Sequence, residues 1–362
     1  MPVIGSYKQA ILPLEITRGS NLSVEPVSQA TTPTPSLPKE KKTSLAQKTF
    51  QALIDYRDTT AGRFLLQGVA TSLHLVNQGA LACGVNLGIG RLVEGELNRK
   101  LFQPEIAPKV KPLKALKEPL EMVILKDKGE PDLYGYYFEK KDSDLAVIYL
   151  HGYNGSIFEC YPECLKINET WNANVLIVDY PGFGLSEGKP TIDGVVKSVE
   201  RTYDHLIQKG FKGKNILMYG VSLGGAIALE TYVTKLKPQG KKVGAIALLY
   251  PFSSIQDITK WRYPEIPHFI IPNDKLNSAK LAKHLDVPLH LAHGDADAKT
   301  PCNQTQKIYR SAAQLSGSGQ KQIYIINGLG HDDLTEANNP SVDGYFESVR
   351  SFIRANFPRH TL

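Results

Sequence analysis

The stretch YGVSLGGAIALE, residues 219–230, decides the fold of this chain, because it places a serine between two glycines at a tight bend. A strand-like apolar run, NILMY, leads into the bend, and a run typical of a helix follows it. Gly-x-Ser-x-Gly alone is a weak pattern in a chain with 30 glycines. Strand, turn and helix together are the setting of a nucleophile elbow, where Gly220 and Gly224 leave room for the crossing backbones. We therefore predict that Ser222 is a nucleophile, which needs a base and an acid elsewhere in the chain.

The composition is that of an ordinary globular protein, with 42% hydrophobic and 22% charged residues among 362. This length exceeds the usual size of a single core, so we expect one large domain and an appendage. The net charge of +6 does not come from a dense basic block with interleaved aromatic residues, which disfavours nucleic-acid binding. The four cysteines form no CxxC pair and join no histidine cluster, so we expect reduced cysteines, no metal and no cofactor.

The chain before residue 119 divides into three segments of different composition. Residues 1–43 are rich in Thr, Pro, Ser and Lys, and we predict a flexible arm that buries little apolar surface. A helical pattern follows over residues 44–100, and a basic linker that contains proline spans residues 101–118. The N-terminus does not show a charged segment followed by an apolar core, so we expect no cleavable signal peptide and a cytoplasmic protein.

Residues 64–90 contain no Asp, Glu, Lys or Arg and are long enough to cross a bilayer. Polar side chains and five glycines make this stretch only moderately apolar. A helical hairpin packed on the main domain is therefore favoured over membrane insertion, and both alternatives stay open. The basic linker leaves open a peripheral contact with an acidic membrane surface.

From residue 119 onward, short apolar runs alternate with segments of helical length. The apolar runs predict eight strands, at residues 120–125, 133–138, 145–150, 175–180, 216–219, 243–250, 288–293 and 322–327. The longer segments predict helices near residues 156–170, 191–209, 224–237, 302–315 and 341–356. This alternation predicts an α/β domain over residues 119–362, with a mostly parallel sheet that is covered by helices on both faces.

The partners of Ser222 are expected at strand ends, where an open α/β sheet gathers its chemistry. The seventh run ends in HGDADAKTP, which contains Asp295 and Asp297, and the eighth is followed by GLGHDDL, which contains His331. The chain order Ser, Asp, His is the one that this sheet topology requires. A neutral imidazole accepts the serine proton, and a carboxylate fixes the imidazole tautomer. We therefore predict His331 as the base and one of the two aspartates as the acid.

At this point the chain resembles the serine hydrolases of the α/β-hydrolase fold. The motifs that carry the resemblance are YLHGYNG, DYPGFGLSEG, the elbow, HGDADAKTP and GLGHDDL, and they cover about residues 120–357. They look closest to the small-lidded branch that includes acyl-protein thioesterases, lysophospholipases and monoacylglycerol-type lipases. The family spacing His-Gly-x-x-Asp-x-x-x-Pro implies that Asp297, rather than Asp295, is the acid of the catalytic triad.

The same resemblance implies an oxyanion hole made by the backbone N–H groups of Tyr153 and Leu223. Only residues 251–287 separate the sixth and seventh strands, so we expect a short lid and an accessible site. Four aromatic side chains could line an acyl pocket, although packing beneath the loops explains each one alone more readily: Phe158, Phe183, Phe252 and Trp261. The resemblance implies a serine esterase, lipase-like enzyme or thioesterase that acts on an acyl chain. The alternative is a catalytically idle α/β-hydrolase domain used for binding.

Overall fold

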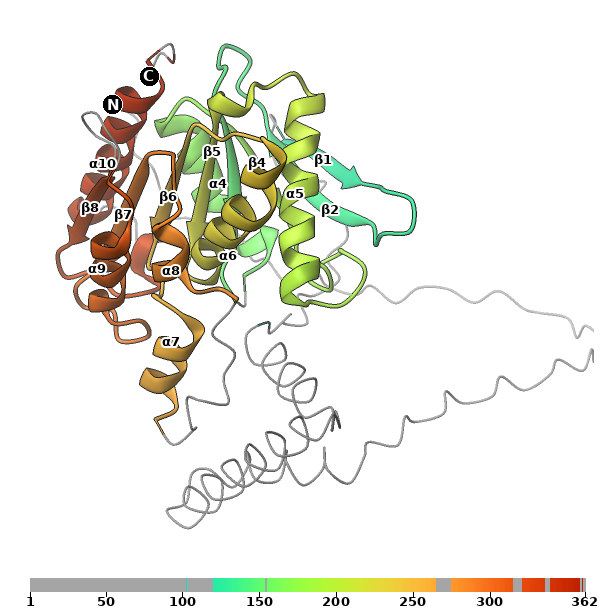
Figure 1. Ribbon diagram of the computed structural model, residues 1–362. Coiled ribbons are helices and arrows are strands. Elements are labelled where there is room, and N and C mark those ends of the chain that lie inside the picture. Colours follow the sequence, from blue (N-terminus) through green and yellow to red (C-terminus); the bar gives the residue numbers. More distant parts are fainter. Residues whose placement is uncertain are drawn as a thin grey trace, which may run out of the picture. The chain divides into compact units, whose positions relative to one another are not determined.

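The computed structural model describes residue 102 and residues 120–153, 155–264, 275–314, 321–335, 339–358 and 360 (Figure 1). The predicted arm, the predicted helical region with its uncharged stretch, and nearly all of the predicted linker lie outside the described residues. Among the helices of the described part, none is long and apolar enough to cross a membrane.

A single eight-stranded sheet forms the centre of the described domain, in the order β1-β2-β4-β3-β5-β6-β7-β8. The first two strands are antiparallel to their neighbours, and all pairs from β4 to β8 are parallel. This arrangement confirms the predicted mostly parallel sheet. The strands are β1 (Leu120–Leu125), β2 (Leu133–Phe138), β3 (Ala146–Leu150), β4 (Asn174–Val178), β5 (Ile216–Val221), β6 (Ala245–Leu249), β7 (Leu289–Gly294) and β8 (Lys321–Ile326).

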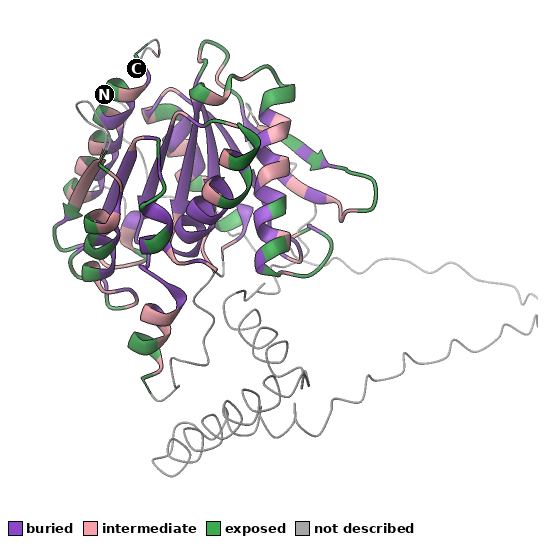
Figure 2. Cartoon of the chain, viewed as in Figure 1, coloured by how far each residue is buried: buried purple, intermediate pink, exposed green. Residues whose placement is uncertain are grey.

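Helices cover both faces of this sheet (Figure 1). They are α4 (Ile157–Thr170), α5 (Ile192–Gln208), α6 (Leu223–Thr231), α7 (Ile255–Arg262), α8 (Ser278–Ala282), α9 (Cys302–Ser311) and α10 (Pro340–Asn356). One apolar cluster joins the sheet to α5, α6, α8 and α9, and a second joins it to α4 and α10. Figure 2 shows the buried strands enclosed by helices whose outer surfaces are exposed.

The burial of the central strands explains why their sequences are continuous apolar runs. Every residue of β3, β4 and β6 is buried, as expected for parallel strands covered on both faces. Successive side chains point to opposite faces, so Met218 of β5 joins one apolar cluster and Tyr219 joins the other. The edge strand β1 has a mixed pattern of buried and exposed residues, because mainly one of its two faces packs on the core.

One predicted helix differs in the structure. The helix expected at residues 224–237 is regular only to Thr231 and then widens into a π-helical turn, Tyr232–Leu236. It ends at Gly240, which adopts a φ of 71°. Pro238 lacks an N–H and cannot continue an α-helical hydrogen-bond ladder, and a glycine in the left-handed region is a common helix end.

Candidate active site

Ser222 lies at the turn between β5 and α6 and has a φ of 54°. A residue with a side chain rarely adopts this backbone region, so the turn is strained. The neighbouring glycines explain how the turn fits. A Cβ at Gly224 would lie 2.0 Å from the backbone oxygen of Leu150, and one at Gly220 would lie 2.5 Å from that of Gly224. The strand, turn and helix that the sequence predicts around Ser222 are therefore all present.

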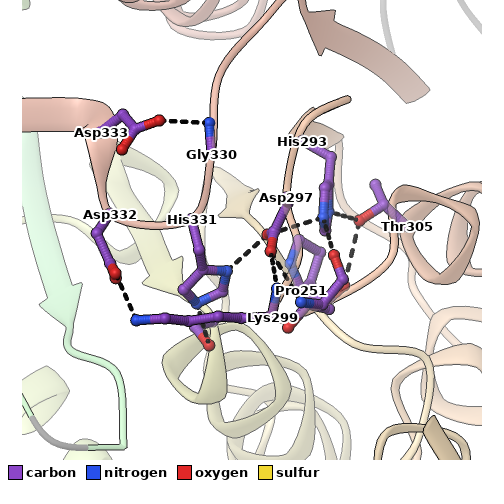
Figure 3. A network of polar contacts seen from close by, with 11 residues as sticks. Pro251, His293, Asp297, Lys299, Thr305, Gly330, His331, Asp332 and Asp333 are labelled. Carbon is purple, nitrogen blue, oxygen red and sulfur yellow. Dashed lines mark hydrogen bonds and ion pairs between the residues drawn. The ribbon is translucent and has the colours of Figure 1, made fainter. Parts of the chain in front are cut away.

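Two hydrogen bonds connect Ser222 to His331 and Asp297. The distance from Ser222 Oγ to His331 Nε2 is 3.2 Å, and that from His331 Nδ1 to Asp297 Oδ2 is 2.6 Å. Asp297 lies in the loop after β7 and His331 in the loop after β8. An ionised carboxylate can only accept, so Nδ1 carries the proton and Nε2 is free to accept from the serine hydroxyl. Figure 3 shows the His331 ring directed at Asp297.

The surroundings of Asp297 keep its carboxylate ionised. Its Oδ1 accepts the backbone N–H groups of Lys299 and Thr300, each at 2.8 Å, and its Oδ2 lies 3.1 Å from His293 Nε2. Burial alone would raise the pKa of Asp297, but the hydrogen bonds from His293, His331 and the backbone outweigh it and hold the pKa well below its ordinary value. Asp297 is therefore an anion at neutral pH.

The structure also places Asp295, the second acidic candidate in the same loop. Its side chain is exposed, and its Oδ1 accepts the backbone N–H of Gly328 at 2.7 Å. That bond joins the loops after β7 and β8. Of the two aspartates, the one within hydrogen-bond distance of His331 is Asp297.

The two predicted oxyanion donors lie on either side of Ser222 in the fold. Leu223 is the first residue of α6, where a backbone N–H has no carbonyl partner within its own helix. Tyr153 lies in the loop after β3, and in this loop the Cβ position of Gly152 would be 3.8 Å from Ser222 Cβ. The ring of Tyr153 packs partly against the core and lies 5.7 Å from the Arg262 guanidinium carbon. Both backbone N–H groups therefore belong to segments next to Ser222.

The four predicted pocket aromatics divide into two groups. Phe183 and Phe252 are buried members of the core cluster on the α5 and α6 face, whereas Phe158 and Trp261 are 54% and 56% exposed. The buried pair therefore packs beneath the loops. The acyl pocket itself stays a prediction.

A second histidine and aspartate lie near one another at the same edge of the sheet. His151 Nε2 is 3.9 Å from Asp179 Oδ1, and His151 stacks on the Tyr180 ring at a centroid distance of 3.9 Å. Burial lowers the pKa of His151 to about 4 and raises the pKa of Asp179 to about 7. Asp179 accepts the backbone N–H of Ile157 at the start of α4. These contacts hold the loop after β3 in place and leave His151 uncharged.

Two contacts that support the site are not predicted by the sequence. His293 Nδ1 lies 2.6 Å from Thr305 Oγ1, which fixes the imidazole whose other nitrogen faces Asp297. Lys299 forms an ion pair with Asp332, the residue after His331, and Figure 3 shows this pair. The ion pair ties together the loops after β7 and β8. The His-Gly pair of HGDADAKTP was a signal for the first contact, whereas no local pattern indicates the second.

Comparison with known sequences identifies one family model and several relatives, one of which is a lipase. The family model described as Serine aminopeptidase, S33 matches residues 141–271. Protein bem46 of Schizosaccharomyces pombe is 25% identical, with a match that covers 60% of this chain and 70% of that protein. Lysophosphatidylserine lipase ABHD12 of Danio rerio is 26% identical, and the match covers 61% of this chain and 62% of the lipase. The matched part thus spans less than two thirds of the zebrafish protein.

Comparison with solved structures gives the same fold. Est1E from Butyrivibrio proteoclasticus, solved with ferulic acid bound, has a TM-score of 0.52 at 18% identity, covering 66% of this chain and all of Est1E. An esterase from Pyrococcus furiosus has a TM-score of 0.52 at 18% identity, covering 65% of this chain and 90% of the esterase. The described domain has the α/β-hydrolase fold, and the resemblance to serine hydrolases of that fold is confirmed.

Proposed function

We propose that this chain, which has the α/β-hydrolase fold, is a serine hydrolase that cleaves carboxylic esters or thioesters of acyl chains. The observation that carries the proposal is the continuous hydrogen-bonded series from Asp297 through His331 to Ser222 Oγ. A histidine between a carboxylate and a serine hydroxyl is the arrangement that activates serine as a nucleophile. The lipase and esterases among the similar proteins support an acyl ester as substrate.

The first half of the reaction forms an acyl-enzyme. Ser222 Oγ attacks the carbonyl carbon of the substrate while His331 Nε2 takes the serine proton. Asp297 holds the Nδ1 proton and stabilises the imidazolium that results. The N–H groups of Tyr153 and Leu223 stabilise the negative oxygen of the tetrahedral intermediate. The intermediate then collapses, and His331 donates its proton to the departing alcohol or thiol.

The second half of the reaction releases the acyl group. Water attacks the acyl carbon, and His331 removes its proton as Ser222 Oγ becomes the leaving group. The proton returns to Ser222, and the free carboxylic acid departs. Neither half needs a metal or an organic cofactor, because protons move only between these side chains, the substrate and water.

Substitution of the nucleophile tests the proposal. We expect Ser222→Ala to lower the turnover of p-nitrophenyl butyrate by about 10⁶-fold, because nothing else in the site replaces the attacking hydroxyl. Ser351→Ala removes an exposed hydroxyl from α10 and serves as the matched control, with turnover like that of the wild type. Circular dichroism checks that both variants are folded. Retained turnover in Ser222→Ala would remove this residue from the mechanism, whereas a wild type without turnover would favour the idle binding domain.

A further inference from the structure

A pocket of about 410 Å³ lies between α7 and α9, and the proposed mechanism does not use it. The loop after β6, the helix α7 and one side of α9 along its whole length line it. Both helices are seen in Figure 1. The loops after β6 and β7 that lead into the pocket leave the same edge of the sheet as the loop that carries Ser222. Because adjacent strands lie about 4.8 Å apart, these loops start within about 10 Å of the end of β5.

Positive charge prevails on the walls of the pocket. Lys260, Lys307 and Arg310 line it and are exposed. Asp257 is the one carboxylate among the described residues that line it, and it already pairs with Lys307 at 2.7 Å. The Asp257 carboxylate also accepts the hydroxyl of Ser253 at 2.5 Å. Within the described part of the chain, Lys260 and Arg310 have no ion pair, so two positive charges face the pocket without a counter-charge.

The floor of the pocket supplies neutral donors. Gln304 is 6% exposed, and its Oε1 accepts the backbone N–H of Ser253 at 3.1 Å. That bond fixes the orientation of the amide, so the Gln304 side chain offers its NH₂ group as a donor from a buried position. The first turn of α9 also lines the pocket, and it contains neither an acidic residue nor a side-chain cap. Uncapped N–H groups at a helix N-terminus favour an anion.

We propose that this pocket binds a phosphate-type anion. The two unpaired cations, the fixed amide of Gln304 and the uncapped first turn of α9 are independent features, and each of them favours negative charge. Trp261 adds an exposed indole at the rim, where it can contact the apolar part of a ligand. The pocket starts at the edge of the sheet that carries Ser222, so an acyl ester with a phosphate group in its alcohol portion could reach both the serine and the pocket. The proposal that the anion is part of the substrate rests on the proposed function. The proposal that the pocket binds an anion does not.

Binding of inorganic phosphate tests the anion site without any catalysis. The chain has two tryptophans, of which Trp171 is fully buried and Trp261 lines the pocket, so a change in tryptophan fluorescence reports on the pocket. Phosphate is titrated into the full chain with Ser222→Ala at constant ionic strength. We expect saturable binding that the added pair Lys260→Gln and Arg310→Gln weakens at least tenfold. The matched pair Lys212→Gln and Lys283→Gln, which removes two exposed charges elsewhere, leaves the affinity as it was. Equal weakening by both pairs, or no saturable binding, would overturn the site.

A hydrolysis assay then distinguishes a phosphate group that belongs to the substrate from free phosphate. The kcat/KM of the otherwise wild-type chain is compared for 1-hexanoylglycerol and 1-hexanoylglycerol 3-phosphate. If the substrate carries the anion, the wild type prefers the phosphate ester, and the Lys260→Gln, Arg310→Gln pair lowers this preference at least tenfold through KM. Phosphate binding without such a preference supports the site and assigns it to free phosphate. If neither ester is hydrolysed, the proposed function fails, while the fluorescence titration still decides whether the anion site exists.

Discussion

His331 and His151 each lie near an aspartate at the carboxyl edge of the sheet, and the surroundings of these two histidines differ in almost every respect. His331 Nδ1 is 2.6 Å from Asp297, and its Nε2 reaches a serine hydroxyl. His151 Nε2 is 3.9 Å from Asp179, and its Nδ1 faces the carbonyl of Gly152 at 2.9 Å. The first histidine is therefore bonded between an acid and a nucleophile, whereas the second is bonded to its own loop.

The electrostatics of the two aspartates differ in the same way. Hydrogen bonds from two histidines and the backbone hold the pKa of Asp297 well below its ordinary value, against the effect of burial. Asp179 has fewer such bonds, and burial raises its pKa to about 7. His151 stays neutral near pH 7, because burial lowers its pKa to about 4. A histidine and an aspartate that lie close together are thus not by themselves a catalytic pair. The hydrogen bonds around the pair decide whether the aspartate is ionised at neutral pH.

The largest expected difference between the two pairs is in turnover. Asp297→Asn should lower kcat about 10⁴-fold, because the amide favours the wrong imidazole tautomer of His331. Asp179→Asn should stay within about tenfold of the wild type, since its amide oxygen can still accept the N–H at the start of α4. Asp295→Asn is a control from the same loop as Asp297 and should also stay within about tenfold. The measurement is kcat on p-nitrophenyl butyrate. A dead Asp295 variant beside an active Asp297 variant would reverse the assignment of the acid.

The second difference is in how tightly the backbone fits around each pair. A Cβ at Gly184, where φ is 48°, would lie 2.0 Å from Asp179 Oδ2. We therefore expect Gly184→Ala to lower the free energy of unfolding by about 2–4 kcal/mol. Gly328, on the loop that carries His331, has a φ of 70° and open space around its Cβ position. Gly328→Ala should cost only about 1 kcal/mol, from the backbone conformation alone. Urea unfolding measures both, and equal losses would mean that the fit around Asp179 is not tight.

The third difference is in the pH dependence of stability. The carboxyl group of Asp179 ionises near pH 4 when unfolded but only near pH 7 when folded, so the wild type loses stability as the pH rises between these values. Asp297 acts in the opposite sense, because its lowered pKa gives stability above about pH 4 that is lost as the pH falls through the folded pKa. On going from pH 5 to pH 8, Asp179→Asn should therefore gain a few kcal/mol relative to the wild type. Urea unfolding at the two pH values measures this, and an unchanged difference would contradict the raised pKa.

Periodicity predicted most of the fold, because the strands and helices follow local apolar patterns. The observed bounds of most elements differ from the predicted ones by one or two residues. The helix after Ser222 becomes π-helical at Tyr232. The three residues of the candidate site were found from strand ends and chain order, but the choice of Asp297 over Asp295 came from the family spacing. In the folded loops, Asp297 accepts the N–H of Lys299 and Asp295 accepts the N–H of Gly328, so the two carboxylates point to different places. These hydrogen bonds cannot be read from the sequence.

Contacts between distant segments could not be predicted in this way. The pair Lys299 and Asp332 joins two loops whose sequences contain no pattern that links them. The same holds for the pocket between α7 and α9, because its charges come from two helices that are separated in the chain by α8 and β7 and meet only after packing. His151 is a further case, since HGYNG in the sequence does not say whether the imidazole is buried or faces a hydroxyl.

Covalent labelling with a fluorophosphonate tests the central claim most directly, because the reagent reacts only with an activated serine. The account predicts one adduct on the intact chain, located on Ser222 by peptide mass spectrometry. Labelling should be absent in Ser222→Ala, strongly slowed in Asp297→Asn and near the wild-type rate in Asp179→Asn. An unlabelled wild type, or an adduct that persists in Ser222→Ala, would contradict the claim that Asp297 and His331 activate Ser222.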